Sequence, residues 1–295
     1  MAQSKLIWQS KTVLLAVLPF AAAGVVLQTH WWLVNAAPVA VWSVGLSVLF
    51  GLAVFQLRAA TPGAAFTGTA ITASLIFSTA NFPYKPWQTA LVPILAVFVL
   101  SYLATRLGRE RKERLGMAEK RSGRTAAQVA ANLGVAALVS DGLVQSWITD
   151  SGWVALTPPS PMPLFALGLA ALAEAAADTV SSEVGQVLGG RPRMVTTLRR
   201  VDAGIDGAVS LAGTLAGVLA AAIVAATGCL ALRVGLAMFW VSWAGGVFGL
   251  FFDSLLGATL ERRGWLNNDA VNFLSTASAA AFAMGWLVVL PHILR

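Results

Sequence analysis

Long apolar runs alternate with short polar segments along almost the whole chain. A helix needs about 20 predominantly apolar residues to cross the hydrocarbon core of a bilayer. Runs of about this length predict membrane-spanning helices at 12–28, 38–57, 64–80, 88–107, 125–142, 162–187, 205–227, 236–257 and 270–290. The proline-rich segments 81–87 and 156–163 predict turns, because proline lacks the amide hydrogen that a helix interior requires. The pattern therefore predicts an all-α, polytopic transmembrane helical bundle with about nine spans.

Composition supports the membrane setting. Of the 295 residues, 57% are hydrophobic and 11% are charged, and the mean hydropathy is +0.74. These values lie outside the range of soluble globular proteins. We expect an integral membrane protein, in the plasma (inner) membrane of a prokaryote, built as one transmembrane domain over 1–295. Within this domain we expect 1–107 to form an apolar scaffold or a lipid groove, and 108–295 to carry the polar site.

The net charge of +7 comes from basic residues concentrated in short loops between the apolar runs. Orientation in the membrane explains such placement, so we expect no nucleic-acid partner. With nine spans and a cytoplasmic N-terminus, 17 of the 20 Lys and Arg residues fall on the cytoplasmic side, which leaves Lys85, Arg233 and Arg295 outside. This asymmetry predicts that the N-terminus is cytoplasmic and the C-terminus outside. The sequence leaves the oligomeric state open.

The segment 106–124 holds eight basic and three acidic residues. It is either a solvated orientation signal or a surface that attracts anionic lipid and nucleotide. We favour the first interpretation. On that interpretation, turnover should change little when four of its side chains are neutralised: Arg109, Arg111, Lys112 and Arg114.

Polar side chains interrupt the apolar runs where the predicted helices approach the cytoplasm. The sixth carries AAADTVSSEVG at 175–185, and VDAGIDGAVS places Asp202, Asp206 and Ser210 on one face of the seventh. The fifth, eighth and ninth add further polar residues near the same side: Arg124, Gln128, Asn132, Asp253, Thr259, Glu261, Asn268 and Asn272. An isolated carboxylate at a helix centre costs roughly 2.5 to 3.5 kcal/mol, so the retained acids require partners or a wet cavity.

Several glycines lie among these acids, and tight helix packing is the safer explanation for them. This interpretation covers Gly213, Gly217, Gly245 and Gly246.

The polar residues favour phosphate chemistry. Carboxylates with amide and hydroxyl oxygens suit Mg²⁺, while arginines and helix N-termini suit phosphate groups. His30 and His292 both fall on the predicted outer side, which disfavours a cytoplasmic zinc site or a Ser-His-Asp triad. The sequence GxxxxGK[ST] of the P-loop nucleotide-binding proteins does not occur.

Five segments in order resemble an integral membrane family that was long of unknown function: GRTAAQVAANLG, AAADTVSSEVG, GIDGAVSLAGTLAG, DSLLGATLE and VNFLSTASA. The family includes the plant chloroplast phytyl-phosphate kinase and a human multi-span membrane protein, and the resemblance covers roughly residues 60–290. It is distantly similar to the CTP-dependent polyprenol kinases and the lipid cytidylyltransferases. The resemblance implies that Asp178, Ser182 and Glu183 contact metal or nucleotide, and that Asp206 and Gly207 lie near phosphates. Glutamate stands at 261, where many relatives are expected to carry glutamine.

Together these features predict a Mg²⁺-dependent lipid kinase that transfers a phosphate from a nucleotide, expected to be CTP, to a prenyl or phytyl monophosphate at the cytoplasmic face. The predicted metal ligands are Asp178, Glu183 and Asp253, and the predicted catalytic residues are Asp178, Asp206 and Asp253. The predicted substrate- and nucleotide-binding residues are Arg124, Gln128, Asn132, Ser182, Arg199, Arg200, Gly207, Asn268 and Asn272.

Two other functions stay open. An ion-coupled membrane transporter would also use acids on glycine-rich helices, but it requires polar groups in both halves of the membrane. The predicted outer half carries little beyond Asp141 and Asp150. A scaffold or lipid-binding protein without catalytic activity would leave the clustered acids unexplained.

Overall fold

The computed structural model describes residues 6–114, 116–119, 121–152 and 164–293. Its elements are α2 (Ile7–Gln56), α3 (Pro62–Ser78), η1 (Pro86–Gln88), α4 (Leu91–Arg106), α5 (Arg109–Arg114), α6 (Ala126–Ser140), α7 (Gly142–Asp150), α8 (Phe165–Leu188), β1 (Arg193–Met194), β2 (Ala208–Val209), α9 (Leu211–Leu232), α10 (Leu236–Leu256), η3 (Gly257–Glu261) and α11 (Asn268–Ile293). The prediction of an all-α fold is confirmed, with one two-residue antiparallel strand pair, β1 and β2. The predicted turn at 81–87 is a loop that leads into η1, and the predicted turn at 156–163 lies outside the described residues.

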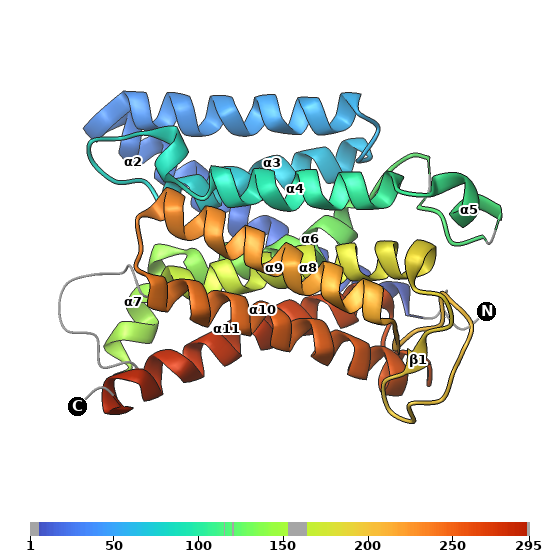
Figure 1. Ribbon diagram of the computed structural model, residues 1–295. Coiled ribbons are helices and arrows are strands. Elements are labelled where there is room, and N and C mark those ends of the chain that lie inside the picture. The colour runs from blue at the N-terminus through green and yellow to red at the C-terminus, as the bar shows by residue number, and fades with distance from the viewer. Residues whose placement is uncertain (1–5, 115, 120, 153–163, 294–295) are drawn as a thin grey trace.

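α2 contains two of the predicted spans. A straight helix of its 50 residues would extend about 75 Å, more than twice the thickness of a bilayer core. The backbone leaves helical geometry at Ala36, where φ is −160° and ψ is 77°. The chain doubles back there, so the blue ribbon runs along the molecule twice (Figure 1). Val25 and Val44, from the two limbs, accordingly share one apolar cluster with Trp32.

The number of membrane crossings is not fixed by the helix lengths. Four helices of the described chain are long and apolar enough to cross a membrane, namely α2, α9, α10 with η3, and α11. α6 and α7, which meet at an angle of 56°, would add a fifth if the bent pair is one span. α3 and α4 have only 17 and 16 residues. Nine spans, and the sides on which the termini lie, therefore stay predictions.

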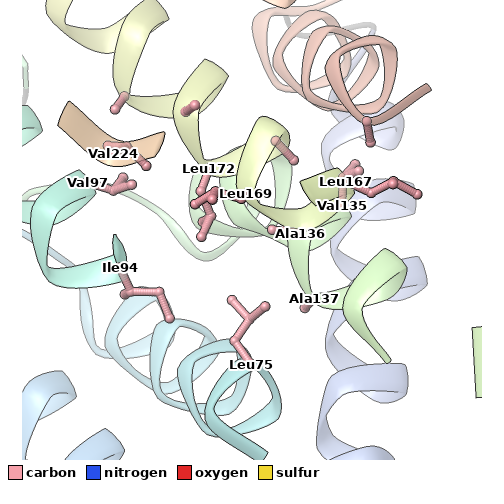
Figure 2. Packing of buried hydrophobic residues seen from close by; sticks show 14 of the residues in the cluster. Leu75, Ile94, Val97, Val135, Ala136, Ala137, Leu167, Leu169, Leu172 and Val224 are labelled. Carbon is pink, nitrogen blue, oxygen red and sulfur yellow. The ribbon is translucent and has the colours of Figure 1, made fainter. Parts of the chain in front are cut away.

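α8 is the central helix of the bundle. Every residue from Phe165 to Ala177 is buried, and the helix packs against α4, α6, α9, α10 and α11. Figure 2 shows part of this core, with Leu169 and Leu172 of α8 together with Val97 of α4 and Val224 of α9. Lipid tails are as apolar as these side chains, so close packing between helices, rather than transfer from water, holds such a core together.

Small residues allow the helices around α8 to approach it closely. A Cβ atom added at Gly217 would lie 2.7 Å from the Ala177 carbonyl oxygen, and one at Gly246 would lie 2.8 Å from the Ala173 Cβ. Gly213 and Gly245 show the same crowding, at 2.5 and 2.8 Å. The packing interpretation of these four glycines is confirmed.

Basic loops gather at one end of the molecule. This basic end comprises 106–124, 189–210 and 261–267, and Figure 1 shows it with α5, β1 and the N-terminus, whereas α7 and the C-terminus lie at the opposite end. The expectation that the charges of 106–124 are all solvated is wrong for Lys112. This side chain is 1% exposed, and its Nζ lies 2.5 Å from Glu183 Oε2 of α8. Nζ also donates to the carbonyl of Thr105 at 2.8 Å, so Lys112 fastens the segment to the bundle.

The seventh predicted helix begins later than its apolar pattern indicated. Residues 201–207 form turns, and α9 starts at Leu211, because the Ser210 hydroxyl caps it by accepting a hydrogen bond from the Gly213 amide at 3.1 Å. The prediction that Asp202, Asp206 and Ser210 share a helical face is therefore wrong. Asp206 instead lies in a tight turn with Gly207, whose φ is +75°.

Candidate functional site

A polar cavity of about 260 Å³ opens between α8, the 203–210 turn, α10 with η3, and the start of α11. These elements belong to, or run into, the basic end. All four elements contribute polar side chains to the cavity: Asp178, Ser181, Ser182, Gln186, Asp206, Ser210, Asp253, Ser254, Glu261, Asn268 and Asn272. The structure thus brings together residues that are separated by up to 94 positions in the chain.

α8 contributes a stripe of polar residues at four-residue spacing. Asp178, Ser182 and Gln186 line the cavity, and Ser182 also donates from its hydroxyl to the Thr179 carbonyl at 3.1 Å. Because α8 is helical without interruption here, residues four apart project on the same side. The helix continues for ten residues beyond Asp178 to Leu188, so Asp178 lies in the body of α8 and not at its end.

α10 brings Asp253 to the opposite wall. The carboxyl groups of Asp178 and Asp253 lie close enough to interact. Directly after α10, the five residues of η3 form a π-helical turn, with the Arg262 amide donating to the Gly257 carbonyl at 3.2 Å. Such wide turns inside helices occur frequently at functional sites. Here the turn carries Gly257 and Glu261 into the cavity wall.

Two helix N-termini also face the cavity. Ser210 caps α9, and Asn268 is the first residue of α11; both line the cavity. The amide groups of a first helical turn and the positive end of the helix dipole attract anions. Gly207 lies against the backbone of α10 with η3, since a Cβ there would come 2.3 Å from the Ala258 amide nitrogen. This contact holds the 203–210 turn on the wall that carries Asp253 and Glu261.

The ionisable side chains that line the cavity in the described chain are all acids. Asp178, Asp206, Asp253 and Glu261 line it, whereas the lining residues within the described chain include no Lys or Arg. Burial raises the pKa of Asp206, which lies in the turn outside the helices, and the neighbouring Arg262 guanidinium opposes this rise. Two lining residues have buried oxygens without a hydrogen-bond partner, Oδ1 of Asp253 and Oε1 of Gln186. Unsatisfied buried acceptors are costly, so they indicate a place where a ligand binds.

The sequence analysis missed a further acid, Glu174. Its side chain is 1% exposed, its Oε1 has no hydrogen-bond partner, and it lies close enough to interact with Asp178 and Ser275. A Cβ at Gly249 would come 2.5 Å from Glu174 Cγ, which shows how tightly α10 covers it. The signal was present in the sequence, because Glu174 lies four residues before Asp178 in an alanine run. Gln186 was missed although it shares the same helix, whereas Ser181 lies in the polar segment 175–185 that the sequence analysis singled out.

The structure places seven of the predicted site residues in the polar cavity: Asp178, Ser182, Asp206, Gly207, Asp253, Asn268 and Asn272. Two others, Arg124 and Asn132, line a neighbouring apolar groove and hydrogen-bond to residues in the cavity wall or next to it in the chain. Arg124 Nη2 donates to Thr179 Oγ1 at 3.1 Å, and Asn272 Nδ2 donates to Asn132 Oδ1 at 3.2 Å.

Four predicted residues are not brought into the cavity. Gln128 forms a capping box with Thr125 at the start of α6, with its Oε1 accepting from the Thr125 amide at 2.7 Å. Glu183 points to α5 and pairs with Lys112, so it is not grouped with Asp178 and Asp253. Arg199 and Arg200 are exposed in the loop after β1. Among the residues that the structure describes, no three His, Cys, Asp or Glu side chains form a complete metal site.

Comparison with known proteins places the chain among membrane proteins. An uncharacterized membrane protein of Synechocystis sp. is 35% identical over 209 residues, which cover 68% of this chain and 74% of the relative. One from Methanocaldococcus jannaschii is 33% identical over 186 residues, covering 63% and 71%. The chloroplastic protein VTE6 of Arabidopsis thaliana is 28% identical over 195 residues, covering 65% and 56%. No solved structure matches the chain.

The family model described as "Integral membrane protein DUF92" matches residues 45–280, a range that includes α3 to α10 and all the polar residues of the cavity. This match confirms the family resemblance that the five sequence segments predicted. It also confirms the integral membrane setting. The chain belongs to the integral membrane protein family DUF92.

Proposed function

We propose that the protein is a membrane-embedded kinase that transfers a phosphate from a nucleoside triphosphate to a prenyl or phytyl monophosphate. The expected nucleotide is CTP, the expected metal ion is Mg²⁺, and the expected face is the cytoplasmic one. Resemblance to a family that includes a plant phytyl-phosphate kinase supports the lipid substrate. The observation that carries the proposal is the cavity itself, where four carboxylates lie beside two helix N-termini.

The charges of the cavity favour a nucleotide that binds together with a cation. The described residues that line the cavity include four carboxylates and no Lys or Arg, so they would repel a triphosphate that carries no bound cation. The carboxylates would hold a divalent cation, and its charge would offset this repulsion when the nucleotide binds. The N-termini of α9 and α11 then supply amide donors for the remaining phosphate oxygens.

The donor set fits Mg²⁺. This ion is commonly bound through one or two carboxylates plus substrate phosphates, without a cage made of protein alone. Asp178 and Asp253 supply two facing carboxylates, and Asp253 Oδ1 is buried with no other partner. When bound, the ion neutralises charge on the phosphates during transfer. In this proposal Glu183 is a structural partner of Lys112 and not a ligand.

The reaction places few demands on the protein beyond alignment. An oxygen of the lipid monophosphate forms a bond to the terminal phosphorus of the nucleotide, and the bond from that phosphorus to the bridging oxygen breaks. The products are a lipid diphosphate and a nucleoside diphosphate. The attacking oxygen is already ionised at neutral pH, so the chain needs no strong base. Asn268, Asn272 and Ser182 orient the phosphates, while the backbone at Gly207 permits their close approach.

Purified protein in lipid nanodiscs tests the proposal. We expect label to pass from γ-³²P CTP to phytyl monophosphate, with the transfer lost on chelation of Mg²⁺ and lost in Asp253→Asn. Asp150→Asn is the matched control, since Asp150 is an exposed carboxylate at the end of α7, far from the cavity. Failure of the folded protein to transfer label from CTP, UTP, ATP or GTP to any prenyl phosphate would overturn the proposal.

A cation-coupled transporter is the second candidate, because a cavity lined by carboxylates alone also suits a cation path. Against it, the acids at the opposite end are few in the described chain. Asp141 caps α7 through the Leu143 amide at 2.9 Å, and Asp150 is exposed. Na⁺ or proton flux into proteoliposomes that depends on Asp178, without any phosphate transfer, would favour the transporter.

A further inference from the structure

An apolar groove of about 140 Å³ lies beside the polar cavity. Its walls come from the second limb of α2, from α3, α4 and α6, and they include Phe50, Val54, Ile94, Val97, Phe98 and Val129. The groove reaches the molecular surface at Leu57, which lines it and is 42% exposed. Apolar side chains that face outward on these helices are those expected to contact lipid. The groove therefore opens where a membrane lipid can enter sideways.

Arginines line the end of the groove that belongs to the basic end. Arg58, Arg106, Arg109 and Arg124 are all part of its lining, with Glu119 as the accompanying acid. Arg109 is paired with Glu113 at 3.1 Å, and Arg106 lies over the ring of Tyr102 at 4.4 Å. Within the described chain, neither Arg58 nor Arg106 takes part in an ion pair. An apolar groove that ends in unpaired guanidinium groups complements an apolar chain that ends in phosphate.

The groove and the polar cavity meet at one turn of α8. Ala175 lines the groove, and Asp178 lines the cavity. Arg124 lies at the boundary, because it lines the groove, donates to Thr179 Oγ1 at 3.1 Å and is close enough to interact with the carboxyl group of Asp178. Asn132 also lies at this boundary. It lines the groove, and its Oδ1 accepts a hydrogen bond at 3.2 Å from Nδ2 of Asn272, which lines the cavity. A phosphate held by Arg124 would thus lie next to the carboxylates of the cavity.

We infer that this groove is the binding site of the acceptor lipid, and that the acceptor is a phosphate monoester on a single long hydrocarbon chain. The chain lies along α3 and α4, and Arg58, Arg106 and Arg124 hold the phosphate at the boundary with the cavity. A monoester carries up to two negative charges, which these three guanidinium groups match better than the single charge of a phosphodiester lipid. The inference rests on the proposed function, and it adds where the acceptor binds and by which route it arrives.

Binding of phytyl monophosphate to the purified protein, measured without nucleotide, tests the groove. Gly68→Leu places a side chain in it, and the backbone tolerates this because the nearest atom to a new Cβ is Val129 Cγ1 at 3.8 Å. Gly45→Leu is the matched control, since its Cβ would meet nothing within 4 Å and Gly45 does not line the groove. We expect Gly68→Leu to bind about tenfold more weakly, as if roughly two methylene groups of the lipid were displaced. Equal binding by the two variants would overturn the inference.

A second comparison tests the arginines. The double variant Arg58→Gln, Arg106→Gln should lose the preference of the protein for phytyl monophosphate over phytol. Arg121→Gln removes a charge whose side chain is 86% exposed and outside the groove, and it should keep the preference. Phosphatidic acid, a monoester with two chains, should bind more weakly than phytyl monophosphate. Equal affinity for phytol and phytyl monophosphate would count against a phosphate-binding site. Equal affinity for phosphatidic acid and phytyl monophosphate would count against a site for a single chain.

The two proposals fail in different ways. Lipid binding that depends on Gly68 and the arginines, in a protein that transfers no phosphate, would overturn the proposed kinase and leave the lipid site intact. Phosphate transfer to phytyl monophosphate that is unaffected by Gly68→Leu would overturn the lipid site and leave the kinase intact.

Discussion

The helices before residue 107 and those after it enclose neighbouring cavities of opposite character. All 13 Asp and Glu residues lie after residue 107, and four of them line the polar cavity. In the earlier helices, buried hydroxyls such as those of Ser47, Thr67 and Thr79 donate to carbonyls of their own helix, so they present little polarity to their neighbours. One half of the molecule therefore resembles the lipid around it, whereas the other half buries carboxylates at a cost in stability.

The contrast indicates where the molecule keeps buried polar groups that lower its stability. Among the described residues, three of the five buried side-chain oxygens without a hydrogen-bond partner lie in or beside the polar cavity, at Glu174, Asp253 and Gln186, and the other two are hydroxyls of the apolar half, at Thr72 and Ser101. A structure selected only for stability would not retain two carboxylate oxygens among them. The following changes test whether the two halves differ in this way.

The largest effect is expected from Asp178→Asn and Asp253→Asn. Each substitution supplies an oxygen but no charge, so Mg²⁺-dependent transfer should fall on the order of a hundredfold or more. The double variant should be scarcely worse than the worse single variant, because the two carboxylates act as a unit. Labelled-nucleotide assays on purified variants measure this. Full activity in either single variant would return that residue to a structural role.

Lys112→Met should cost the most stability. It leaves the Glu183 carboxylate, which is 13% exposed, without its partner, and breaking a buried ion pair in this way costs about 3 to 5 kcal/mol. Adding Glu183→Gln should recover part of the loss. Unfolding in mixed micelles measures both variants, with Arg114→Met as an exposed control on α5, because the Arg114 Nε donates to the Glu110 carbonyl of the same helix. No loss of stability in Lys112→Met would show that the pair is not needed to fasten α5 to α8.

Glu174→Gln should separate function from stability. Removing a charge that is buried beneath the cavity should raise the unfolding temperature. The Mg²⁺ concentration needed for half-maximal transfer should rise by about tenfold, because Glu174 supports the carboxylates that face the ion. A lower unfolding temperature with an unchanged Mg²⁺ requirement would assign Glu174 to packing alone.

The smallest effect is expected in the apolar half. Thr72 of α3 is fully buried, and its hydroxyl has no hydrogen-bond partner. Thr72→Val replaces that hydroxyl with a methyl group of similar size, so stability should stay unchanged or rise by about 1 kcal/mol. Transfer activity should be unaffected. A marked loss of activity would show that the apolar half also holds catalytic machinery, and would weaken the contrast between the halves.

Local pattern was enough to predict most of the helices and much of the cavity. Each apolar run overlaps a helix, because apolar composition over some 20 residues and the backbone's need for internal hydrogen bonds in lipid leave few alternatives. The four-residue spacing of Asp178 and Ser182 placed them on one face of α8, and Gly207 and Asn268 also line the cavity, while the roles predicted for them stay predictions. The start of α9 was misplaced, since the apolar pattern does not show that Ser210 caps the helix and that residues 201–207 form turns.

Sequence by itself therefore determined the membrane setting, the helical fold and which polar residues stand on each helix. Tertiary structure alone decided which helix faces meet. It turned Glu183 toward Lys112, 71 positions away, and Asp178 toward Asp253, although all of these acids looked alike in their local surroundings. It also joined Arg124, which lines the groove, to Thr179, the residue that follows Asp178. The reason is physical: periodicity reflects the geometry of one helix, whereas contacts between helices depend on how closely small residues such as Gly246 and Gly249 allow distant segments to pack.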